Sequence, residues 1–231
     1  MTIGLVFLSL LMAIIVGWLF RQTIHVQPWV AQAGVPGVSV AFARPVGRTA
    51  LWVFLGVASS LFVLFVSAYA MRLGWTDWSP LPRPRLLAVN TAMLVAASVT
   101  MQWTVFAARR ANDTGVRRGL AASGGLTIAF IVGQLVVWKQ LADAGFYVST
   151  SAASSFFYLL TAVHGLHVIG GLVAWARACA KAWRGADRSR LRAGVELCAT
   201  YWHYLLAVWA LLYALLVSSD LGLAICSSAS L

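Results

Sequence analysis

The chain has 231 residues, 61% of them hydrophobic and 10% charged, and its mean hydropathy is +0.84. Soluble domains are about 45–50% apolar and about 25% charged, so the composition argues against a soluble domain. The net charge of +11 comes from basic residues that lie between long apolar runs rather than on one amphipathic face, which favours a membrane protein over a nucleic-acid-binding one.

Long apolar stretches predict how often the chain crosses a membrane. A helix crossing about 30 Å of hydrocarbon needs about 20 mostly apolar residues, whose backbone groups must bond within the helix. Stretches that meet this requirement occupy residues 3–20, 49–70, 86–108, 119–138, 155–176 and 195–218. We therefore predict an all-α, polytopic membrane bundle of about six transmembrane helices.

The first stretch is separated from the others. The segment between the first two stretches is rich in Pro and Gly and reads as an irregular linker. Residues 1–48 are thus predicted to form an extra N-terminal helix and linker, and residues 49–231 a five-helix bundle with a short tail. Cleavage of the first stretch as a signal peptide is the alternative, but no Lys or Arg precedes it and Arg21 follows it directly.

The distribution of basic residues predicts sidedness. Most of the 17 Lys and Arg residues lie in the loops after the first, third and fifth stretches. The exceptions are Arg72, Arg83, Arg85 and Lys139. Because basic loops stay in the cytoplasm, both termini are expected outside, and the inner surface is expected to attract anionic lipid.

Ionisable side chains inside the membrane are costly, so each is a functional candidate. The fifth stretch holds His164 and His167, which share a helix face, and the sixth holds Glu196 and His203. Thr200 lies on the same face as Glu196 and His203, and small residues continue both faces. Because small residues allow close approach and polar groups bond across the gap, we expect the last two helices to pack through these faces.

The expected depth of the histidines in the membrane supports this predicted contact, or seam, between the last two helices. His167 lies ten residues before Arg177, and His203 lies eleven after Arg192, so the two imidazoles are expected at one level. Glu196 is expected near the basic surface, beside the arginines of the intervening loop. A proton-handling role and direct metal ligation are the alternatives, but a metal site would need further ligands at the same depth.

Two motifs carry a family resemblance. Residues 157–171 read F-Y-L-L-T-A-V-H-G-L-H-V-I-G-G, and residues 194–204 read G-V-E-L-C-A-T-Y-W-H-Y. Both resemble segments of subunit III of the haem-copper terminal oxidases, as in cytochrome c oxidase, and the likeness extends loosely over 49–218. The sequence departs from many members by having no acid between Arg48 and Asp77, and Leu206 in place of an aspartate.

The resemblance implies a non-catalytic subunit III of a proton-pumping respiratory oxidase that reduces oxygen to water. It implies haem and copper in a partner catalytic subunit, contacts with subunits I and II, bound phospholipid, and support of proton uptake. No catalytic, cofactor-binding or metal-binding residue is expected in this chain, and no nucleic-acid partner. The expected location is the bacterial inner membrane, with the basic loops cytoplasmic.

Eight residues are predicted as structural or lipid-contact positions. They are His164, His167, Arg192, Glu196, Thr200, Tyr201, Trp202 and His203. Three other functions are alternatives to an oxidase subunit III. They are an accessory subunit of a nitric oxide reductase, a stand-alone proton-coupled transporter, and a membrane cytochrome with histidine-ligated haem. The sequence shows neither the inverted repeats nor the broken helices that are common in transporters.

Overall fold

The structure is a computed structural model that describes residues 46–73, 78, 81–82, 84–185 and 187–228, with side chains described between 47 and 216. The described residues form five α-helices. Their bounds are α2 Val46–Arg72, α3 Leu86–Arg109, α4 Asp113–Asp143, α5 Ala152–Trp183 and α6 Arg188–Ser228. All five are long and apolar enough to cross a membrane, which confirms the predicted polytopic helical fold. The span predicted at 3–20 lies outside the described residues.

The helices extend beyond the apolar stretches that predicted them. Helix α4 begins at Asp113 rather than at residue 119, and α6 begins at Arg188 rather than at residue 195. Hydropathy locates only the part that lies in hydrocarbon, whereas a helix continues wherever its backbone hydrogen bonds and end caps are satisfied. The extra turns carry charged residues, so they extend the helices into the headgroup layer.

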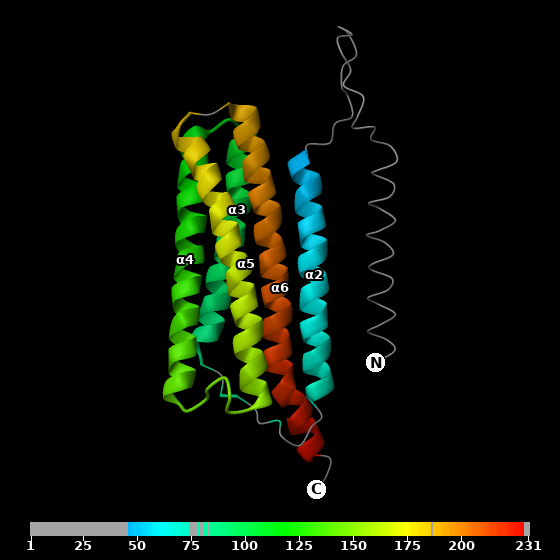
Figure 1. The fold of residues 1–231 in the computed structure, drawn as a ribbon. Helices are drawn as coiled ribbons and strands as arrows, with labels where there is room; N and C mark the ends of the chain where they lie inside the picture. Colours follow the sequence, from blue (N-terminus) through cyan, green and yellow to red (C-terminus); the bar gives the residue numbers. More distant parts are fainter. Residues whose placement is uncertain (1–45, 74–77, 79–80, 83, 186, 229–231) are drawn as a thin grey trace, which may run out of the picture. The chain divides into compact units, whose positions relative to one another are not determined.

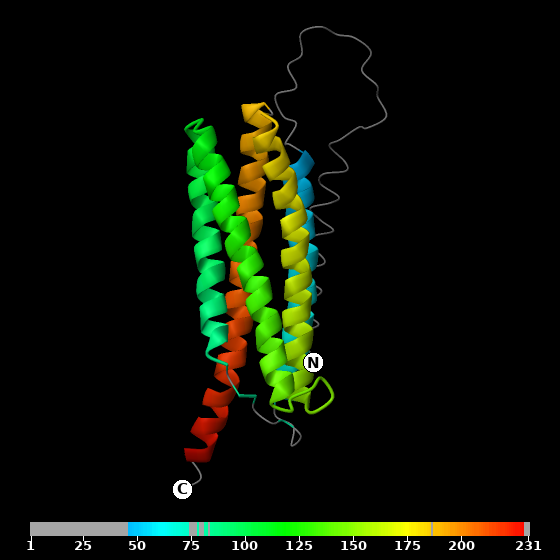
Figure 2. The same ribbon diagram turned by 90° about the vertical axis from the view of Figure 1, so that its left-hand side faces the viewer.

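Helices α3 to α6 form a bundle in which α3 packs against α4 and α6, and α5 packs against the same two helices. Consecutive helices of this bundle run antiparallel (Figure 1, Figure 2). The α3–α4 turn and the α5–α6 loop lie at one end, and the α4–α5 loop lies at the other (Figure 1). The two basic connections of this bundle therefore share one end, which we call the basic end. Helix α2 belongs, up to Ala68, to a separate unit.

Local signals explain where α4 and α5 begin. The Asn112 side chain accepts a hydrogen bond from the backbone N–H of Gly115 at 2.9 Å and so caps α4. Ser151 and Ser154 form a reciprocal capping box at the start of α5. Ala111, in the turn before α4, has φ = 54°, a left-handed conformation that favours glycine.

Small residues set the closest approach between α3 and α4. Gly115, Gly119 and Ser123 recur every fourth residue of α4 and are buried. A Cβ at Gly119 would lie 2.1 Å from Thr104 Oγ1 on α3, whereas a Cβ at Gly125 would meet nothing within 4 Å. The α4 face that carries Gly119 is therefore the one that lets the two backbones come together.

Candidate functional site

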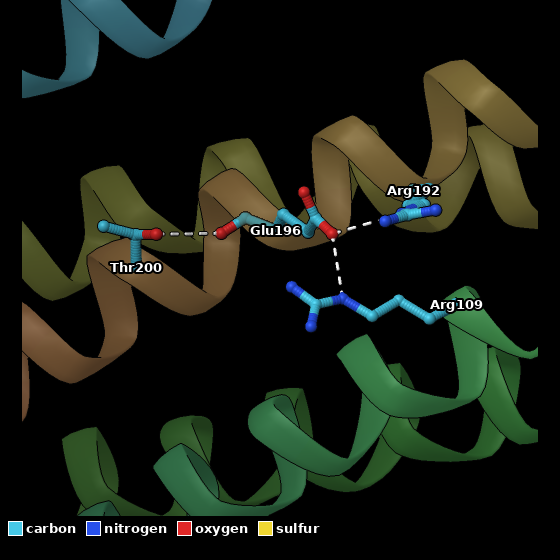
Figure 3. A network of polar contacts seen from close by, with 4 residues as sticks. All are labelled: Arg109, Arg192, Glu196 and Thr200. Carbon is cyan, nitrogen blue, oxygen red and sulfur yellow. Dashed lines mark hydrogen bonds and ion pairs between the residues drawn. The ribbon is translucent and has the colours of Figure 1, made fainter.

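Glu196 lies at the centre of a polar network near the basic end. Its Oε1 accepts hydrogen bonds from Arg109 Nε at 3.1 Å and from Arg192 Nε at 3.2 Å (Figure 3). The Thr200 hydroxyl donates to the Glu196 carbonyl oxygen at 3.0 Å. The sequence places Glu196 beside the arginines between the last two spans, and one of these, Arg192, is its partner from within the start of α6. Arg109, at the end of α3, is a partner that the sequence did not predict.

His203 lies two turns further along α6 and also faces α3. Its Nδ1 is 2.5 Å from Ser98 Oγ, and its Nε2 is 3.0 Å from Gln102 Oε1. A neutral imidazole that donates from Nε2 and accepts at Nδ1 satisfies both contacts. Both ring nitrogens are thus engaged in hydrogen bonds to a neighbouring helix.

These contacts form one antiparallel set, which we call the α3–α6 ladder. Trp209 adds a third level, because its indole N–H donates to Thr91 Oγ1 at 3.0 Å. Moving along α6 from Glu196 to His203 to Trp209, the partner on α3 moves back from Arg109 to the Ser98–Gln102 pair and then to Thr91. The full ladder consists of Thr91, Ser98, Gln102, Arg109, Arg192, Glu196, Thr200, His203 and Trp209.

Tyr201 and Trp202 point away from the ladder and contact other helices. The Tyr201 hydroxyl donates to the backbone carbonyl of His167 on α5 at 2.9 Å. The Trp202 indole N–H donates to Thr127 Oγ1 on α4 at 3.1 Å. Gly171 makes room for this packing, since a Cβ there would lie 2.8 Å from the Tyr201 ring. Both aromatic residues are buried.

The two histidines of α5 have different surroundings. His164 is fully buried, and its ring centroid lies 5.2 Å from that of Trp209 and 6.0 Å from that of Phe130. His167 is half-buried, and its Nδ1 lies 2.7 Å from the Val163 carbonyl oxygen on the same helix. His164 therefore belongs to an aromatic cluster contributed by α4, α5 and α6, whereas His167 bonds within α5.

The predicted seam between the last two helices is half correct. The small residues expected to continue the α5 face are Gly171, Ala174 and Ala178, of which Gly171 and Ala178 are buried and Ala174 is exposed. On α6, the face of Glu196, Thr200 and His203 contacts α3 instead of α5, so the expected meeting of His167 and His203 does not occur. The reason is geometric, because α6 has two neighbours and Tyr201, one position from Thr200, takes the side that faces α5.

A buried amide pair between α3 and α4 was not predicted from the sequence. Asn90 Nδ2 donates to Gln134 Oε1 at 3.3 Å, and both residues are buried. Gly133 accommodates this pair, since a Cβ there would lie 2.2 Å from Asn90 Oδ1. Counting neutral amides inside the apolar stretches, and not only ionisable residues, would have identified both positions.

The chemistry of these groups is that of helix association. Hydroxyl, amide, imidazole and carboxylate groups bond from one helix to the next, as polar side chains do within membranes. Among the described residues, no three His, Cys, Asp or Glu side chains are grouped as a metal site requires. The ion pairs of Glu196 lie on partly exposed side chains, so each contributes little to stability.

Comparisons with known proteins agree on one family. The sequence model described as cytochrome c oxidase subunit III matches residues 49–218, which include most of each of the five described helices. The probable cytochrome c oxidase subunit 3 of Mycobacterium tuberculosis is 33% identical over 161 residues, covering 68% of this chain and 78% of that protein. That of Nocardia farcinica is 33% identical over 159 residues, covering 68% and 77%. Cytochrome c oxidase subunit 3 of Synechocystis sp. is 30% identical over 168 residues, covering 70% and 71%.

Proposed function

The chain belongs to the cytochrome c oxidase subunit III family and is a subunit III of a terminal oxidase, and from this premise we propose that it is the non-catalytic scaffold of that complex. The observation that carries the proposal is the match over residues 49–218. Oxygen is reduced to water at haem and copper in the catalytic subunit, and this chain stabilises that subunit and its proton uptake. Subunits I and II and membrane phospholipid are its partners.

The use of the polar residues supports a scaffold role. His203 commits both ring nitrogens to Ser98 and Gln102. Tyr201 commits its hydroxyl to α5, and Trp202 commits its indole N–H to α4. Side chains engaged in this way join helices together, and a metal ligand would need a ring nitrogen that is not already used in such a bond.

Sidedness is proposed from the basic end. Arg110, Arg117, Arg118, Arg184 and Arg190 gather near the α3–α4 turn and the α5–α6 loop. Because basic loops remain on the cytoplasmic side, the basic end faces the cytoplasm of a bacterial inner membrane. Cysteine substitution at Arg118 and at Tyr147, which lie near opposite ends, tests this. Membrane-impermeant thiol reagents added to whole cells should label position 147 and leave position 118 unlabelled.

Gentle detergent extraction of a tagged chain tests the assembly. We expect an oxidase core to copurify, with the visible spectrum of haem and with oxygen-reducing activity. If the copurified core reduced nitric oxide instead of oxygen, the chain would be an accessory subunit of a nitric oxide reductase. A chain that emerges alone would contradict the subunit proposal, and a stoichiometric Soret band on the isolated chain would contradict its non-catalytic role.

Glu196→Gln tests whether the Glu196 network also serves lipid retention. Neutralising the carboxylate weakens its contacts with Arg109 and Arg192, which frees both arginines to move. We expect less phospholipid per complex after detergent washing and fewer turnovers before inactivation. Asp143→Asn is the control, because it makes the same charge change on an exposed residue at the end of α4 that lies away from the basic end. Equal lipid content in the Glu196→Gln variant and the parent would contradict the headgroup role of this network.

A further inference from the structure

A cleft at the basic end is not used by the contacts described so far. The start of α4, the end of α5 and the start of α6 lie at this end of the bundle (Figure 1). Residues at these three helix ends line the cleft, whose volume is about 410 Å³. Four charged residues line it, Asp113, Arg117, Asp187 and Arg188, and Leu191 adds an apolar surface. The lining carries two guanidinium groups and two carboxylates, so its charges cancel on an end of the molecule that is otherwise strongly basic.

Hydrogen bonds hold the charged groups around the cleft. Arg117 Nε donates to the backbone carbonyl of Ala182 at 3.2 Å, which ties α4 to the end of α5. Arg188 Nη2 lies 3.4 Å from Asp113 Oδ2, which joins the starts of α6 and α4. The Ser189 hydroxyl donates to Asp187 Oδ2 and lowers the pKa of that carboxyl below its ordinary value. Asp187 is therefore ionised at neutral pH.

The depth of the cleft places it in the headgroup layer of the membrane. Trp183 is 52% exposed and directly follows Ala182, which lines the cleft. Exposed indole rings at the ends of membrane-spanning helices lie at the level of the lipid headgroups. The cleft is thus in contact with a layer in which phosphodiesters and amines are the abundant polar groups.

We propose that this cleft binds the headgroup of a zwitterionic phospholipid that carries a primary amine. The phosphate is recognised by Arg117 and Arg188, and the ammonium group is recognised by Asp113 and Asp187. An anionic headgroup without an amine would bring its negative charge close to both carboxylates with no ammonium group to offset it, so it binds less well. The site is separate from the Glu196 network, and it depends on membrane placement rather than on assembly with an oxidase core.

Lipid add-back tests the proposal. The chain, in its complex or alone as extraction yields it, is stripped of lipid and mixed with equal amounts of phosphatidylethanolamine and phosphatidylglycerol. Bound lipid is then counted by native mass spectrometry. We expect phosphatidylethanolamine to be preferred by about fivefold, the effect of one additional charge contact near the membrane surface. An equal or reversed preference would overturn the proposal.

Matched variants localise the preference to the cleft. Arg117→Gln should reduce total binding of phosphatidylethanolamine, and Asp187→Asn should reduce its advantage over phosphatidylglycerol. Arg118→Gln, the neighbouring exposed arginine that does not line the cleft, should leave both unchanged. If Arg118→Gln has the same effect as Arg117→Gln, general surface charge explains the binding and the proposal fails.

A soluble competitor distinguishes the lipid from a free metabolite. Glycerophosphoethanolamine carries the same charged groups without acyl chains. We expect it to displace the lipid only at a large excess, because it lacks the membrane that concentrates the headgroup at the cleft. Equal potency of the soluble compound would overturn the assignment to a lipid. Since the readout is bound lipid, its failure leaves the proposed oxidase role untouched.

Discussion

Helix α3 contacts its two neighbours by different means. Against α4 it approaches closely, because Gly119 leaves space that the Thr104 side chain occupies. Against α6 it forms the α3–α6 ladder, in which larger polar side chains bridge the gap, as in the contact of His203 with Gln102. Lipid supplies no hydrophobic force that drives helices together, so close packing and polar bonds are the means available. Helix α3 packs closely against α4, where the Asn90–Gln134 amide pair adds one polar bond, and it contacts α6 through the polar bonds of the ladder.

The largest effect is expected at the α3–α4 interface, where there is no room for a larger side chain. Gly119→Leu should destabilise the bundle by about 3 kcal/mol, because the new side chain collides with Thr104 in a closely packed interface. Gly125→Leu is the matched control, since that position has open space around it. The free energy of unfolding in mixed detergent–SDS micelles measures both. Equal losses in the two variants would show that close approach on the Gly119 face is not what holds α3 and α4.

A smaller effect is expected for the ladder. His203→Leu and Gln102→Leu should be coupled by about 0.6 kcal/mol in a double-mutant cycle, the usual size for a hydrogen bond between membrane helices. The same cycle between His203 and His167 should give no coupling, because the structure places His203 against α3. Coupling with His167 and none with Gln102 would restore the seam expected from the sequence.

The smallest effect concerns the turn that joins α3 to α4. Ala111 has φ = 54°, where a side chain is strained and glycine is not. Ala111→Gly should therefore stabilise the chain by about 0.5 kcal/mol after the greater flexibility of unfolded glycine is subtracted. Thermal unfolding of parent and variant checks the sign. A lower melting temperature would mean that flexibility outweighs strain in this turn.

The sequence predicted the spans and the polar face of α6 because both depend on local patterns. Hydropathy located the helices, and helical periodicity placed Glu196, Thr200 and His203 together. Periodicity did not identify which helix these residues contact. It shows which residues share a face of α6 but not which helix lies opposite that face, and α6 has two neighbours. The amide pair of Asn90 and Gln134 was not predicted because only ionisable residues within the spans were taken as candidates. The cleft required the ends of three helices, which only the fold brings together.

The ladder also restricts how α3 and α6 can move. A slide of one helix past the other by one turn, about 5.4 Å, would separate Glu196 from Arg109 and His203 from Gln102 in the same step. Tilting both helices as one rod breaks none of these bonds. A displacement of this pair at one membrane surface therefore moves both helices together across the bilayer, and the two helices do not slide past one another.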